Sequence, residues 1–232
     1  VTKYITQYLE STVSELNQLL LNFNYKQNFN YDDFYVSKSN FFAFELIENW
    51  PHWEKNILNI YGEKYSGKSH LAKIFCNKNK GKKINANQLN FEILKEFKLY
   101  ENIAIDNFQN NLEEKLLYSL FNLVDHDNKY LLINSLIPIN EMNFKLDDLK
   151  SRSKNCLFAK IESPDDELMF AIILKSFSDR QIAIDKKLID FIIKRIDRSY
   201  GKISDFIYKI DELSLRKKKP IDFKTIKEIL KV

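Results

Sequence analysis

The stretch that most constrains the fold is a short loop that holds two of the chain's four glycines. A β-branched apolar run at residues 57–61 precedes this loop, and a helical apolar pattern at residues 71–75 follows it at once. The loop matches the GxxxxGK[ST] pattern between a strand and a helix. Its residues are Gly62, Glu63, Lys64, Tyr65, Ser66, Gly67, Lys68 and Ser69, and His70 follows them.

Loops of this type bind phosphate, because successive backbone N–H groups point inward and the new helix adds the positive end of its dipole. We therefore predict that residues 62–70 hold the phosphates of ADP or ATP. Lys68 is expected to reach the β- and γ-phosphates, and the Ser69 hydroxyl is expected to ligate Mg²⁺. The alternative is a chance match in an ordinary glycine-containing turn.

A second candidate lies at the end of an apolar strand predicted at residues 102–107. Asp106 ends the second strand after the loop, where P-loop NTPases hold their Mg²⁺, so we predict that it is the second Mg²⁺ ligand. The next residue is Asn107, which can orient a water but cannot accept its proton, so hydrolysis at this site should be slow. Asn134 and Ser135 end the following strand and are candidates to contact the γ-phosphate or the attacking water.

Two segments before the loop are further candidates for binding. Gln18-Leu19-Leu20-Leu21-Asn22-Phe23 has the QxxLxF form that a bacterial sliding clamp binds. Gln18 would hydrogen-bond at the rim of a pocket while Leu19, Leu21 and Phe23 supply apolar side chains; the alternative is that the leucines pack on the chain's own core. Phe34 and Val36 either form a wall for an adenine ring or anchor the segment before the first core helix.

The order of the elements predicts an α/β fold. Strands expected at residues 57–61, 83–86, 102–107, 130–135 and 156–161 alternate with helices, which is typical of a five-stranded parallel sheet. After Pro164 only helices are expected, near residues 165–178, 185–198, 203–216 and 222–231. We therefore expect an N-terminal segment at residues 1–30, an α/β domain at 31–163 and a small helical domain at 164–232.

Composition adds limits. The net charge of +4 over 232 residues tolerates a nucleic-acid neighbour without arguing for one. Two distant cysteines without histidine neighbours do not support a zinc site and favour a reducing compartment. No apolar run is long enough to cross a bilayer and no signal peptide is evident, so we expect a cytoplasmic protein without a membrane partner.

Arg152 lies on a short predicted helix just before the last strand, at the edge of the domain. There it could neutralise charge on a neighbouring subunit's γ-phosphate as an arginine finger. The alternative is a solvated basic residue. If acids of its own chain held the guanidinium and it could not face a neighbour, the arginine-finger role would be excluded.

These features together resemble an AAA+ module, and in particular the short regulatory members of the DnaA clan known as Hda. The segments that carry the resemblance lie at residues 34–40, 49–53, 62–70, 103–107, 149–152, 164–168, 177–181 and 226–230. The resemblance implies an ADP-bound regulator that binds the sliding clamp of DNA polymerase III, reaches DNA through it, and stimulates hydrolysis of DnaA-bound ATP. The resemblance does not decide whether the chain forms a homodimer.

The chain departs from that family at two positions. The usual lid arginine is replaced by Ser204, with Lys202 as a nearby substitute, and a sensor aspartate is replaced by Leu136. Two other functions stay open: an ATPase in its own right that acts on DNA, like a helicase loader, and a clamp-bound scaffold with a vestigial nucleotide site.

Overall fold

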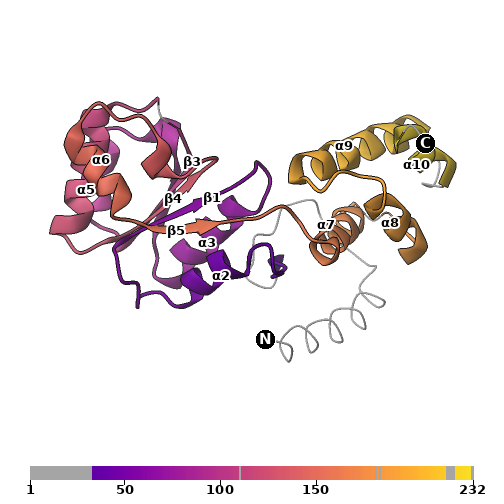
Figure 1. Cartoon of the computed structure of the whole chain (residues 1–232), viewed down its shortest axis with the longest axis horizontal. Helices are drawn as coiled ribbons and strands as arrows, with labels where there is room; N and C mark the ends of the chain where they lie inside the picture. The colour runs from indigo at the N-terminus through magenta and orange to yellow at the C-terminus, as the bar shows by residue number, and fades with distance from the viewer. Residues whose placement is uncertain (1–32, 110, 181, 183, 218–222, 231–232) are drawn as a thin grey trace. The chain divides into compact units, whose positions relative to one another are not determined.

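The structure is a computed structural model that describes residues 33–109, 111–180, 182, 184–217 and 223–230. The predicted clamp-binding peptide at residues 18–23 lies outside them. The described part contains a parallel sheet with helices on both faces, and a separate group of helices follows it in the chain (Figure 1).

The sheet has five strands in the order β2-β3-β4-β1-β5, and every pair is parallel. Its strands are β1 (Ile57–Tyr61), β2 (Lys82–Asn85), β3 (Asn102–Phe108), β4 (Tyr130–Ser135) and β5 (Leu157–Lys160). The central strands are rich in Ile and Leu because both of their faces are covered. This confirms the predicted α/β fold with a five-stranded parallel sheet.

Helices cover both faces of this sheet. Helices α5 (Glu114–His126) and α6 (Asp147–Lys154) lie on one face, and α2 (Phe41–Glu48) and α3 (Lys68–Lys78) lie on the other (Figure 1). Alternate strand residues pack into one cluster with α5, as at Ile103, Ile105 and Ile133. The intervening residues, such as Leu58, are buried on the opposite face, because successive strand side chains point to opposite faces.

One helix begins later than the sequence pattern predicts. The apolar spacing of Leu89, Ile93 and Phe97 predicts a helix over residues 88–97, but a 3₁₀ turn, η2 (Ala86–Gln88), comes first and α4 (Phe91–Phe97) follows. The Asn90 side chain accepts a hydrogen bond from the Ile93 backbone N–H at 2.9 Å and so caps α4. A second 3₁₀ turn, η3 (Ile139–Glu141), follows β4.

The chain divides into two compact units. The first holds the sheet and its helices up to Leu168, together with the segment Asp197–Ser204; the second holds Met169–Ile196 and the residues from Asp205 onward. The remaining helices are α7 (Asp166–Ser178), α8 (Lys186–Ile193), α9 (Tyr200–Lys217) and α10 (Phe223–Leu230). Among the described residues, no helix combines the length and apolar character needed to span a membrane.

Candidate nucleotide-binding site

The glycine-rich loop joins β1 to α3 and has the backbone that its motif predicts. Gly67 precedes the first residue of α3 with φ of 92°, and Gly62 has φ of 150°. A Cβ on Gly67 would lie 3.0 Å from the Phe34 ring, and one on Gly62 would lie 2.7 Å from the Ile161 carbonyl oxygen. Both positions therefore require glycine, because a side chain would be strained and crowded there.

Lys68 turns back onto this loop. Its Nζ donates to the carbonyl oxygens of Gly62 at 2.7 Å and Glu63 at 2.6 Å, and to the Ser66 hydroxyl at 3.3 Å. Burial lowers the pKa of Lys68 to about 8, although the carboxylates of Asp106 and Glu63 act in the opposite direction. The loop thus holds a cation at its mouth, and an incoming phosphate would exchange for these oxygens.

Ser69 and Asp106, the two predicted Mg²⁺ ligands, lie in hydrogen-bond contact, and a third side chain joins them. The Ser69 hydroxyl hydrogen-bonds the Asp106 carboxylate, and Lys83 Nζ lies 3.0 Å from Asp106 Oδ2. Burial alone would raise the pKa of Asp106; the hydrogen bond from Ser69 and the ammonium of Lys83 outweigh it, and the pKa is lowered. The oxygen pair suits Mg²⁺ by its chemistry, whereas a lysine ammonium already contacts it.

Asn134 is fully buried at the end of β4 and connects three elements. Its Nδ2 donates to the Lys68 carbonyl oxygen at 2.8 Å and to Asp106 Oδ1 at 3.2 Å, and its Oδ1 has no hydrogen-bond partner among the described residues. Ser135 instead donates to the Ile137 carbonyl oxygen at 2.6 Å. Contact of Asn134 with a γ-phosphate stays a prediction.

Asn107 follows Asp106 at a bulge in β3. Its φ is 55°, its side chain is exposed, and its backbone N–H donates to Asp106 Oδ1 at 3.2 Å. Asparagine tolerates this left-handed conformation better than most residues, and the register between β3 and β4 shifts at this point. The bulge therefore turns the Asn107 side chain out of the sheet next to the buried carboxylate.

The other residues predicted to contact the nucleotide range from buried to exposed. Phe34 is buried, stacks on Phe44 and meets the His70 ring edge-on, so it anchors the segment before α2. Val36 is half-buried. Lys64 lies 5.0 Å from the centre of the exposed Tyr65 ring. A role of Phe34 or Val36 in adenine binding stays a prediction.

The Glu63 side chain binds the first residues of α9 within the same compact unit. Its Oε1 accepts from the Gly201 N–H at 2.9 Å and from the Ser199 hydroxyl, and its Oε2 accepts from the Tyr200 N–H at 3.1 Å. Lys202 and Ser204, expected to stand near the nucleotide, lie in this first part of α9. Lys202 is exposed there and its backbone N–H donates to Ser199.

Arg152 is held by two carboxylates of its own chain. Its Nε donates to Asp148 Oδ2 at 2.6 Å within α6, and its Nη1 pairs with Asp125 of α5. Its side chain exposes 27% of its surface and lies beside the Tyr118 ring, 5.7 Å from the ring centre. Acids of its own chain therefore hold Arg152, which is one of the two conditions that would exclude an arginine finger. The other condition, that Arg152 cannot face a neighbouring subunit, is not tested, so action in trans stays a prediction.

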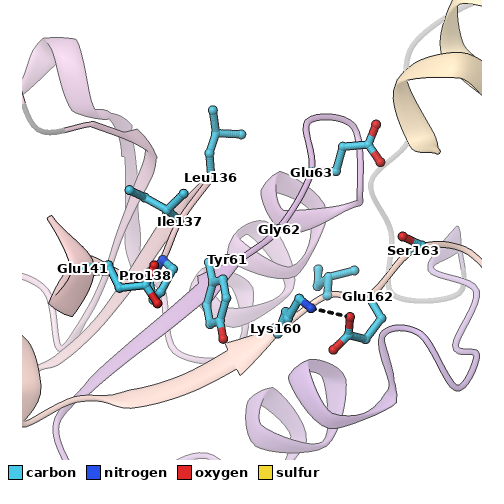
Figure 2. A pocket seen from close by; sticks show the side chains of 11 residues that line it. Tyr61, Gly62, Glu63, Leu136, Ile137, Pro138, Glu141, Lys160, Glu162 and Ser163 are labelled. Atoms are coloured by element: carbon cyan, nitrogen blue, oxygen red, sulfur yellow. Dashed lines mark ion pairs between the residues drawn. The ribbon is translucent and has the colours of Figure 1, made fainter.

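A pocket of about 450 Å³ adjoins the start of the glycine-rich loop. Figure 2 shows its side chains at the ends of β1 and β5 and on the segment after β4, with Lys160 paired to Glu162 at 2.7 Å. The pocket is lined by Tyr61, Gly62, Glu63, Leu136, Ile137, Pro138, Glu141, Lys160, Ile161, Glu162 and Ser163.

Sequence reasoning missed two residues. Asn59, fully buried in β1, donates through Nδ2 to the Ile133 carbonyl oxygen and the Ser135 hydroxyl, both at 2.9 Å, and accepts from the Ile139 N–H at 3.0 Å. Its signal was a polar residue inside an apolar strand. Lys83 had a weaker signal, a lysine on the strand that becomes the neighbour of β3.

Comparison with solved structures identifies the arrangement. Domain III of the Thermotoga maritima DnaA matches 90% of this chain and 98% of its own, with a TM-score of 0.71 and 21% identity. AMPPCP-bound DnaA from Aquifex aeolicus matches 83% of this chain and 70% of its own, with a TM-score of 0.65 and 20% identity. This is a DnaA-like AAA+ fold.

Sequence relatives agree with a DnaA-like AAA+ module, although no model of a known protein family matches the chain. DnaA of Caldanaerobacter subterraneus subsp. tengcongensis is 26% identical over 98% of the chain, and DnaA of Thermodesulfovibrio yellowstonii is 24% identical over 94%. The chain spans 57% and 56% of those relatives' lengths. An uncharacterized Haemophilus influenzae protein is 23% identical over 86% of the chain and 92% of its own length.

Proposed function

We propose that this chain is a nucleotide-binding regulator of chromosomal replication initiation that holds ADP or ATP at residues 62–70. The observation that carries the proposal is the loop itself. Gly67 adopts the left-handed conformation, and Lys68 donates hydrogen bonds to three oxygen atoms of the loop. Phosphate oxygens are the ligands that such a loop binds. A DnaA of similar fold is bound to AMPPCP, which supports nucleotide binding by this chain.

The proposed site holds nucleotide rather than turning it over quickly. Asn107 stands beside Asp106 where a second carboxylate would accept a proton from the attacking water, and an amide has no such basicity. This favours a switch over the competing proposal of a DNA-dependent ATPase like a helicase loader. Rapid ATP turnover by the isolated chain would favour the competing proposal.

The regulatory part of the proposal concerns partners. Gln18, Leu21 and Phe23 would bind the sliding clamp of DNA polymerase III, which places the chain on DNA, and DnaA would be the initiator on which it acts. The clamp is tested separately from the nucleotide site: Gln18→Ala with Phe23→Ala should abolish retention of purified clamp. Unchanged retention would refute the tether while leaving nucleotide binding unaffected.

Arg152 is the proposed contact with DnaA-bound ATP, and its ion pairs would have to break for this contact to form. To serve a neighbour's phosphate, the guanidinium would have to exchange Asp125 and Asp148 for phosphate oxygens, which also accept charge-assisted hydrogen bonds. Arg152→Ala should remove stimulation of DnaA hydrolysis, whereas Lys154→Ala on the same helix should not. Equal stimulation by the Arg152→Ala protein would refute the finger.

Nucleotide binding is the first experiment. Titration of the isolated chain with fluorescent ADP and ATP should give saturable binding that Lys68→Met largely removes, while Lys95→Met, on α4 outside the loop and with its side chain 71% exposed, should preserve it. Folding of both variants is checked by circular dichroism. No binding by the wild-type chain would refute the proposal and favour a scaffold with a vestigial site.

A further inference from the structure

We propose that the ammonium of Lys83, and not Mg²⁺, is the cation beside Asp106, so that this site binds nucleotide with little dependence on Mg²⁺. The inference rests on the proposed nucleotide site. It concerns the charge that accompanies the phosphates and the residue that supplies it.

The geometry places Lys83 against the carboxylate that the motif assigns to a metal. Lys83 Nζ lies 3.0 Å from Asp106 Oδ2 and donates to the Ser69 carbonyl oxygen at 3.0 Å. From the strand next to Asp106 in the sheet, it therefore contacts one predicted Mg²⁺ ligand directly and the backbone, but not the hydroxyl, of the other. The Asp106 side chain exposes only 9% of its surface and that of Lys83 exposes 31%, so the pair lies partly out of solvent.

The other carboxylate oxygen of Asp106, Oδ1, also has hydrogen-bond partners. Oδ1 receives the Asn134 side chain and the Asn107 backbone N–H, each at 3.2 Å, and Ser69 donates to the same carboxylate. Magnesium requires a near-octahedral set of oxygens at about 2.1 Å. To bind at Asp106, it would have to displace the ammonium of Lys83.

Charge leads to the same conclusion. The ammonium of Lys83 already neutralises the carboxylate of Asp106, and Lys68 is near enough to interact with the same carboxylate. A divalent cation next to Lys83 would be repelled, because two cations a few ångströms apart interact strongly in a partly desolvated site. The phosphates of a nucleoside diphosphate or triphosphate would instead find two ammonium groups.

The neighbouring lysine shows that this placement is specific to Lys83. Lys82 precedes it on β2, and its Nζ lies 3.4 Å from Glu96 of α4. Successive residues of a strand point to opposite faces, so Lys82 leaves the site while Lys83 enters it. Lys82 is therefore the matched control for a substitution at Lys83.

The test compares binding of N-methylanthraniloyl-ADP in excess EDTA and in excess Mg²⁺ for the wild-type chain, Lys83→Met and Lys82→Met. We expect the wild-type dissociation constant to differ by less than about threefold between the two buffers. Lys83→Met should bind about tenfold more weakly in EDTA and recover most of the loss in Mg²⁺. Lys82→Met should behave as wild type.

A second readout follows the metal directly. Electron paramagnetic resonance of Mn²⁺ should show no tightly bound ion in the wild-type ADP complex and one in the Lys83→Met complex. A wild-type affinity that falls tenfold or more in EDTA, or tightly bound Mn²⁺ in the wild-type complex, would overturn the inference. Absence of ADP binding by the wild-type chain in both buffers would instead overturn the proposed function, and the wild-type arms decide the matter even if Lys83→Met does not fold.

Discussion

The burial of Lys68 predicts that nucleotide affinity depends on pH in a definite direction. The free site holds this ammonium with a pKa of about 8. Bound phosphate is an anion beside the ammonium and favours its charged form, so the pKa in the complex is higher than in the free site. Nucleotide binding above pH 8 must therefore take up a proton.

The magnitude follows from this pKa. At about pH 7 the ammonium is charged in about nine molecules in ten; at about pH 9 it is charged in only about one in ten, so the affinity for ADP should be about tenfold lower at pH 9 than at pH 7. Lys68→Met should remove the dependence together with most of the binding. Isothermal titration calorimetry at about pH 8.5, in buffers of different ionisation enthalpy, should show net proton uptake.

Stability of the free protein should change in the opposite direction. The folded pKa of Lys68 lies below its ordinary value of 10.5, so between about pH 8 and pH 10.5 the unfolded chain holds more protons and this group favours folding increasingly as pH rises. Below pH 8 its full destabilising effect is present. An ADP affinity that stays constant from pH 7 to pH 9, with no proton uptake, would refute this account of Lys68.

Two further substitutions test the scaffold of the site. Gly67→Ala should weaken ADP binding at least about tenfold and lower the free energy of unfolding by about 1–2 kcal/mol, because the new Cβ meets the Phe34 ring at 3.0 Å in a left-handed conformation. Titration with ADP measures the first effect and urea unfolding the second. An affinity equal to that of the wild type would contradict the prediction. Asn59→Ala should lower the free energy of unfolding in urea by about 3 kcal/mol, because it leaves buried partners such as the Ile139 N–H unpaired. Asn87 is exposed, so Asn87→Ala should change this free energy by less than about 0.5 kcal/mol. Equal effects of the two substitutions would contradict the role of Asn59.

Most of the fold could be predicted because the strands that form the sheet are continuous apolar runs bounded by clear breaks. The strand predicted at residues 130–135 has the same bounds in the structure. The start of α4 could not be placed from periodicity, since Asn90 caps the helix and the apolar pattern begins before the cap. Helix ends depend on local hydrogen bonds that an apolar pattern does not report.

The site was predictable as far as its motifs reach. The contact between Ser69 and Asp106 follows from the order of the loop and the next apolar strand. The place of Lys83 depends on which strands are neighbours and on how far a lysine stem extends, and neither is written in local spacing. For Arg152, the partner Asp148 stands four residues earlier on the same helix and was a readable signal, whereas Asp125 reaches it only through the packing of α5 against α6.

The residues around Asp106 act on binding and on hydrolysis in different ways, and this separates the two activities. Two lysines favour the nucleotide phosphates, whereas hydrolysis also needs a base that accepts a proton, and positioned general bases contribute about 10²–10⁴-fold to such reactions. Asn107 supplies no base. Asn107→Glu would place a carboxylate next to Asp106, and if the missing base limits turnover, ATP hydrolysis should rise while ADP affinity falls through repulsion. Hydrolysis that stays at the wild-type rate in a folded Asn107→Glu protein would mean that another step, such as placement of the attacking water, limits the reaction.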